Sequence, residues 1–123
     1  TEIITVLNKI KPPYNINSLT QNAALEKISN LKETNKQIDI VLSERDMLVD
    51  YLDGLSFVKT VFPTDANFVL IRVDDANKRY TQLIKNGIIV RNRDGQPLCD
   101  NCLRITIGTP KENQKLINAL ESI

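Results

Sequence analysis

The sequence contains no histidine and no tryptophan, and it has only two cysteines in 123 residues. Without histidine the chain cannot build a Ser-His-Asp or Cys-His catalytic pair, and it lacks the commonest protein ligand for transition metals. Two cysteines make no disulfide framework and are typical of a reducing cytoplasm, where we expect the protein to be located. Three tyrosines and three phenylalanines are too few for a surface that stacks nucleic-acid bases.

Neither sign of charge is in excess, since 16 Lys and Arg balance 15 Asp and Glu to a net charge of +1. The basic residues are scattered, so we expect no nucleic-acid partner, which would need a basic patch or stripe. No apolar run approaches the ~20 residues that span a membrane, so we expect no membrane partner either. An apolar fraction of 41% and a charged fraction of 25% are typical of one globular domain.

Apolar periodicity predicts three helices in the first half of the chain, over residues 1–10, 19–29 and 35–52, with a polar break at 30–34. Pro12 and Pro13 should stop the first helix, and residues 1–17 are predicted to be a linker or hinge ahead of a domain formed by residues 18–123. Ser18 is the predicted N-cap of the second helix. Gly54 is predicted to end the third in the left-handed conformation.

The second half is predicted to hold four strands and two helices: strands 58–62, 67–73, 88–91 and 103–107, and helices from 75 to 86 and from 110 onward. Gly87 should end the first of these helices, and Thr109, Pro110 and Glu112 carry the signals that start the second. This order predicts an α+β fold, a two-layer module in which a small, mainly antiparallel sheet has helices packed on one face.

Two arginines lie within apolar strand-like runs, Arg91 after Gly87–Val90 and Arg104 in Leu103–Ile107. Side chains alternate along a strand, so Arg104 should lie on the face opposite the core residues of its run. A planar guanidinium can bind a carboxylate or phosphate through two parallel hydrogen bonds, which suggests an anion site. The alternative for Arg104 is a solvated arginine on an open sheet face, and for Arg91 a surface charge at a strand end.

Cys99 and Cys102 form a CxxC spelling, but zinc would require two further ligands from histidine or cysteine. The pair precedes a strand, not a helix, as a thioredoxin-like motif would require. We therefore predict reduced thiols and no metal site, and a redox or metal module is a weaker alternative.

Five segments together resemble the C-terminal part of histidinol-phosphate aminotransferase, a pyridoxal-phosphate enzyme of fold type I. In chain order they are residues 11–18, 44–46, 65–68, 87–91 and 102–109, with the spellings KPPYNINS, ERD, DANF, GIIVR and CLRITIGT. The resemblance covers the whole chain. Looser forms of the last two segments occur in other aminotransferases of this type and in threonine-phosphate decarboxylases.

The resemblance implies an enzyme of histidine biosynthesis that exchanges an amino group between L-histidinol phosphate and 2-oxoglutarate, giving imidazole-acetol phosphate and glutamate. Arg104 matches the small-domain arginine expected to bind the α-carboxylate of glutamate or the phosphate of histidinol phosphate. Arg91 matches a second arginine, expected to assist with the phosphate or the side-chain carboxylate. A guanidinium suits both kinds of anion.

The resemblance also implies that the lysine that binds pyridoxal phosphate lies in a large domain that this chain lacks. We therefore expect no catalytic and no cofactor-binding residue here, an inactive chain when it is alone, and a homodimeric full-length enzyme. Two alternatives remain open: a stand-alone, small-molecule-binding regulatory module with a ferredoxin-like sheet, and the small domain of a threonine-phosphate decarboxylase.

Overall fold

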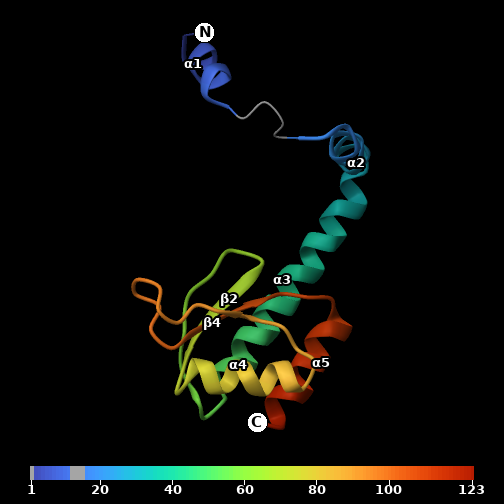
Figure 1. The fold of residues 1–123 in the computed structure, drawn as a ribbon. Helices are drawn as coiled ribbons and strands as arrows, with labels where there is room; N and C mark the ends of the chain where they lie inside the picture. Colours follow the sequence, from blue (N-terminus) through green and yellow to red (C-terminus); the bar gives the residue numbers. More distant parts are fainter. Residues whose placement is uncertain (1, 12–15) are drawn as a thin grey trace. The chain divides into compact units, whose positions relative to one another are not determined.

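The computed structural model describes residues 2–11 and 16–123, and in these ranges it contains five helices and four strands. The helices are α1 (Glu2–Ile10), α2 (Ser18–Ser29), α3 (Leu31–Asp53), α4 (Ala76–Lys85) and α5 (Pro110–Glu121), and the strands are β1 (Val58–Val61), β2 (Phe68–Val73), β3 (Arg91–Asn92) and β4 (Cys102–Thr106). The chain divides into two compact units, Thr1–Lys36 and Gln37–Ile123. Figure 1 shows the elements in chain order.

The first unit holds α1, α2 and the start of α3, and neither α1 nor α2 has a buried residue. Ser18 was predicted to cap α2, but the cap is Asn17, whose extended backbone lets Oδ1 accept a 2.9 Å hydrogen bond from the Thr20 N–H. The predicted break at 30–34 is also wrong. Asn30 alone separates the helices, because it ends α2 and its Oδ1 accepts from the Glu33 N–H at the start of α3. The predicted stop at Pro12 and Pro13 lies outside the described residues.

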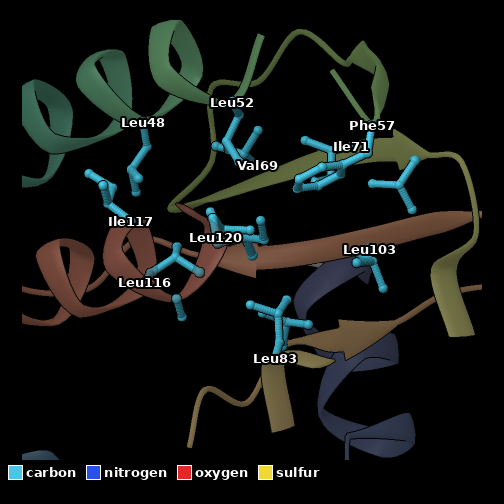
Figure 2. Packing of buried hydrophobic residues seen from close by; sticks show 14 of the residues in the cluster. Leu48, Leu52, Phe57, Val69, Ile71, Leu83, Leu103, Leu116, Ile117 and Leu120 are labelled. Atoms are coloured by element: carbon cyan, nitrogen blue, oxygen red, sulfur yellow. The ribbon is translucent and has the colours of Figure 1, made fainter. Parts of the chain in front are cut away.

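The second unit is built on a four-stranded sheet with the order β1-β2-β4-β3, and every neighbouring pair is antiparallel. Alternation along β2 and β4 buries Val69, Ile71, Val73, Leu103 and Ile105 on one face. Residues of α3, α4 and α5 pack on that face, and Figure 2 shows Leu48, Leu83 and Leu116 from the three helices around it. The predicted α+β sheet with helices on one face is confirmed.

α5 begins directly after the loop that follows β4. Thr109 and Glu112 form a capping box, in which the hydroxyl of Thr109 accepts from the Glu112 N–H and the Glu112 carboxylate accepts from the Thr109 N–H at 2.9 Å. The backbone bond from Thr109, and then the bond from its hydroxyl, lower the pKa of Glu112. The predicted start of this helix is confirmed, and its residues Leu116, Ile117 and Leu120 are buried in the core.

Two glycines predicted to end helices behave differently. Gly87 has φ +74° and lies in a Schellman motif, in which the Gly87 N–H bonds to Ile84 O and the Ile88 N–H to Leu83 O, both at 2.9 Å. The backbone of Gly54 is not in the left-handed conformation. Instead α3 ends in a turn in which the Gly54 N–H donates to Tyr51 O at 3.2 Å. The prediction for Gly87 is thus confirmed. For Gly54 the predicted end of the helix is confirmed, since α3 ends at Asp53, and the predicted left-handed backbone is wrong.

The third strand is shorter and later than the predicted 88–91. The backbone N–H of Ile88 bonds to Leu83 O at the end of α4 and not to a neighbouring strand. Pairing with β4 begins at Arg91, so Arg91 is the first residue of β3 and not the last residue of a strand. From β1 onward the element order is β-β-α-β-β-α. This is the element order expected for the alternative of a stand-alone module with a ferredoxin-like sheet, so the order of elements does not separate that alternative from an aminotransferase small domain.

Candidate functional site

Arg91 and Arg104 lie directly opposite each other on neighbouring antiparallel strands. Residues paired in this way have side chains on the same face of the sheet, here the face turned away from the helices. Two like charges in cross-strand register destabilise a sheet unless an anion compensates them. The chain therefore brings together the two arginines that the sequence singled out, thirteen positions apart.

Arg104 is half-buried and is not the freely solvated arginine of the alternative reading. Its guanidinium lies over the ring of Phe68, with Cζ 5.0 Å from the ring centroid. This contact keeps the guanidinium plane in place and favours its charge. The Nε atom is buried and has no hydrogen-bond partner. A buried donor without an acceptor is rare in folded proteins, and Nε of Arg104 is such an unsatisfied donor.

The two arginines line a pocket of about 530 Å³ beside the edge strand β3. The other residues that line it are Tyr80, Ile89, Val90, Asn92, Arg93 and Thr106. No carboxylate is among them, so three arginines line this pocket with no acidic residue in its wall. Arg93 was not singled out from the sequence, because it lies in a polar loop; its spacing of two residues from Arg91 was the available signal.

The other three arginines of the chain have protein partners. Arg79 binds both oxygens of the Asp74 carboxylate, at 2.9 and 2.7 Å, and this hydrogen bonding lowers the pKa of Asp74 to about 2. Arg45 contacts Asp46 at 3.6 Å. Arg72 donates to two backbone carbonyl groups in the 93–101 loop. Among the described residues, Arg91, Arg93 and Arg104 have no ion-pair partner, which sets them apart from these three.

The 93–101 loop that joins β3 to β4 is held in one conformation by side-chain hydrogen bonds. Arg72 donates to the carbonyl oxygens of Leu98 and Asp100, both at 3.1 Å. Leu98 and Asn101 have positive φ values of 65° and 55°, which few residues other than glycine adopt. The Asn101 N–H donates to Asp94 Oδ1 at 2.9 Å. These contacts determine where the chain enters β4 after β3, and so they support the β3–β4 register in which Arg91 lies opposite Arg104.

A second network supports the other end of β4. The buried side chain of Asn113 accepts from the Gly108 N–H at 2.9 Å and donates to Gly108 O at 3.1 Å and to Glu44 Oε2 at 2.7 Å. It thereby joins the β4–α5 loop to both α5 and α3. Gly108 must lack a side chain, because a Cβ there would lie 2.9 Å from the Cβ of Glu112.

Both cysteines are free thiols, and Cys102 is fully buried in the sheet. Burial raises the pKa of the Cys102 thiol, which opposes formation of the reactive thiolate. In residues 2–11 and 16–123 no group of three or more potential metal ligands occurs. Nor is any helix in these ranges long and apolar enough to cross a membrane.

The chain is similar to known aminotransferases along its whole length. The family described as aminotransferase class I and II matches residues 1–120. The histidinol-phosphate aminotransferase of Flavobacterium psychrophilum is 54% identical over 121 residues, which cover 98% of this chain and 35% of that protein. The crystal structure of the histidinol-phosphate aminotransferase from Clostridium acetobutylicum matches with a TM-score of 0.82 at 29% identity, over 98% of this chain and 37% of that one.

The L-threonine-O-3-phosphate decarboxylase of Porphyromonas gingivalis has a TM-score of 0.70 at 21% identity, over 98% of this chain and 38% of that one, which shows a shared fold alone.

The chain belongs to the aminotransferase class I and II family. Within that family its high-identity relatives are histidinol-phosphate aminotransferases, as the sequence motifs predicted. The chain spans about a third of the length of these relatives, 35% of the one from F. psychrophilum.

Aminotransferases of this class generally depend on pyridoxal phosphate, which a lysine of the enzyme binds as a Schiff base. A lysine that forms a Schiff base is activated by a desolvated or cationic environment. Every lysine in the described ranges is exposed, and none lines the arginine pocket. No described lysine therefore has the desolvated surroundings that activate a Schiff-base lysine.

Proposed function

We propose that this chain is the substrate-clamping small domain of a histidinol-phosphate aminotransferase. The whole enzyme would transfer an amino group between L-histidinol phosphate and 2-oxoglutarate. The observation that carries the proposal is the cross-strand pairing of Arg91 with Arg104 over a pocket whose wall contains no carboxylate. The identity of the relatives supports the same substrate class.

Both substrates of such an enzyme present anions to the same surface. A carboxylate or a phosphate can accept two parallel hydrogen bonds from one guanidinium. Arg104 is the primary clamp, because the Phe68 ring orients it and its Nε lacks an acceptor. Arg91, on the exposed edge strand, is the accessory contact. Binding the anionic group of a substrate in this way holds its reacting carbon in a fixed orientation.

The large domain of the enzyme would hold pyridoxal phosphate, which supplies the electron sink for transamination. On this proposal the 123-residue chain alone has no transaminase activity, and the whole enzyme is a cytoplasmic homodimer. The coding sequence upstream of Thr1 tests the arrangement. A reading frame that continues upstream into a large domain supports it, and a start codon near Thr1 would favour a stand-alone binding module.

The test of the clamp uses the enzyme translated from the complete reading frame. Arg104→Gln should lower kcat/KM for both histidinol phosphate and glutamate by about 10- to 100-fold, because charge-assisted hydrogen bonds contribute roughly 1.5–3 kcal/mol. Lys59→Gln removes the same charge from exposed β1, away from the pocket, and should leave both values within twofold. Equal kinetics for the Arg104 variant and wild type would refute the assignment.

The same preparation separates the two phosphate-ester enzymes that share this fold. Amino transfer from histidinol phosphate to 2-oxoglutarate produces glutamate, whereas decarboxylation of threonine phosphate releases carbon dioxide. We expect glutamate formation and no carbon dioxide release. The opposite pair of results would assign the chain to the decarboxylase.

A further inference from the structure

We propose that Arg93 is a specificity-determining residue of this site, which favours a phosphate dianion over a carboxylate. The inference rests on the proposed function and extends it to a residue outside the segments that carry the family resemblance. Arg93 lines the same pocket as Arg91 and Arg104 and is two residues from Arg91, so alternation places both side chains on one face. Its N–H pairs with Cys102 O at 2.9 Å, which continues the ladder beyond β3.

The charge of Arg93 is not compensated within the described part of the protein. The side chain is half-buried, yet no ion pair or side-chain hydrogen bond involves it. The carboxylate of the neighbouring Asp94 forms its hydrogen bonds with other residues: Oδ1 accepts from the Asn101 N–H at 2.9 Å, and Oδ2 accepts from Asn77 Nδ2 at 3.2 Å. A partly desolvated cation without a counter-ion is costly, so this position favours a bound anion.

The number of arginines that line the pocket indicates which kind of anion it favours. A carboxylate carries one charge and two acceptor oxygens, which one bidentate arginine satisfies. A phosphate monoester carries about −1.5 to −2 charges and three acceptor oxygens at neutral pH. Arg104 suffices for a carboxylate, whereas a phosphate can also engage Arg91 and Arg93. The third arginine is therefore expected to contribute to phosphate binding and little to carboxylate binding.

The experiment compares the two half-reactions of the enzyme translated from the complete reading frame. Arg93→Gln should lower kcat/KM for histidinol phosphate about tenfold, as expected for the loss of one charge-assisted hydrogen bond, and should change kcat/KM for glutamate less than about twofold. Arg93→Lys keeps the charge and should recover part of the loss. An equal loss for both substrates, or no loss for either, would overturn the proposal.

Inorganic phosphate bound to the 123-residue chain separates this proposal from the proposed function. Backbone amide shifts of Arg91, Arg93 and Arg104 are followed by NMR as phosphate is added. Arg93→Gln should weaken phosphate binding several-fold, and Lys59→Gln, the same charge change at an exposed position, should leave it unchanged. Equal weakening by both variants would show a general effect of net charge and sink the role of Arg93. An enzyme inactive on histidinol phosphate, with phosphate binding that still depends on Arg93, would refute the proposed function alone.

Discussion

The buried Asn113 side chain donates a 2.7 Å hydrogen bond to the carboxylate of Glu44, and so joins α5 to α3 across 69 residues of sequence. The same amide group accepts from the Gly108 N–H and donates to its carbonyl group. One side chain thus connects two helices and the loop that follows the Arg104 strand. Its amide is suited to this task, because it offers donors and an acceptor at once.

Asn113→Ala should therefore destabilise the fold by roughly 1–3 kcal/mol, because it leaves a carboxylate and two backbone groups of the loop without their partner. Urea denaturation followed by circular dichroism measures the change in the free energy of unfolding. Gln114→Ala, at the exposed neighbouring position, should stay within about 0.5 kcal/mol of wild type. Similar losses for both variants would show that the network does not contribute.

Gly108→Ala should be destabilising by about 1–3 kcal/mol, because its Cβ would lie 2.9 Å from Glu112 Cβ and 3.2 Å from Asn113 Oδ1. Gly54→Ala is the matched control, since a Cβ there meets Tyr51 O at an ordinary 3.5 Å and φ is not positive. We expect the control to be neutral, or stabilising by up to about 1 kcal/mol. Thermal unfolding of both variants measures the contrast, which a stable Gly108→Ala variant would contradict.

The ion pair between Asp74 and Arg79 makes a pH-dependent contribution to stability. The pKa of Asp74 is lowered to about 2 by its hydrogen bonds to Arg79, so the folded state binds this proton more weakly than the unfolded state. The contribution is present above the unfolded pKa of about 3.9 and is lost as pH falls through 2. The Asp74 side chain is 35% exposed, and solvent screening limits the effect to about 1 kcal/mol or less.

Asp74→Asn should accordingly lower stability at pH 7 and have little effect near pH 2. Unfolding by urea at a series of pH values measures the difference between wild type and variant. Asp39→Asn serves as the control and should show no such trend, because Asp39 is exposed on α3 and forms no ion pair with any residue that the structure describes. A difference for Asp74→Asn that does not vary between pH 2 and pH 7 would contradict the ion-pair explanation.

The pairing of Arg91 with Arg104 predicts a response to anions. In a buffer of low ionic strength without a bound anion, Arg91→Gln should raise stability by about 0.2–1 kcal/mol, because it removes a cross-strand like-charge pair. Sodium phosphate should raise the Tm of wild type more than that of the variant, since a ligand stabilises the state that binds it. Sodium chloride at equal ionic strength is the control for screening. Equal shifts with both salts would leave no role for a specific anion.

The parts of the fold that depend on local signals were predictable from the sequence. Thr109, Pro110 and Glu112 mark the start of α5 whatever surrounds them, and Gly87 ends α4 because glycine adopts a left-handed backbone without the steric cost of a Cβ. The N-cap of α2 was placed one residue late, because Asn17 and Ser18 are both good caps and only the backbone conformation of Asn17 decides between them.

The parts that depend on long-range pairing were not predictable. The run Ile88–Val90 is apolar enough for a strand, but the Schellman bond to α4 and the register with β4 delay pairing to Arg91. The sequence suggested both arginines as anion ligands without showing that they face each other. Arg93 was missed for the same reason, since its place at the pocket depends on how the 93–101 loop returns to β4.

The position of each arginine in the sheet also determines how freely it can move. β4 is hydrogen-bonded to β2 on one side and to β3 on the other, whereas β3 is a two-residue strand at the edge of the sheet. Backbone amides near Arg91 should therefore exchange with solvent faster than those near Arg104. The backbone at Arg104 is thus held by a strand on each side. We expect Arg91 to shift with the edge strand, which would let the distance between the two charges adapt to anionic groups of different size.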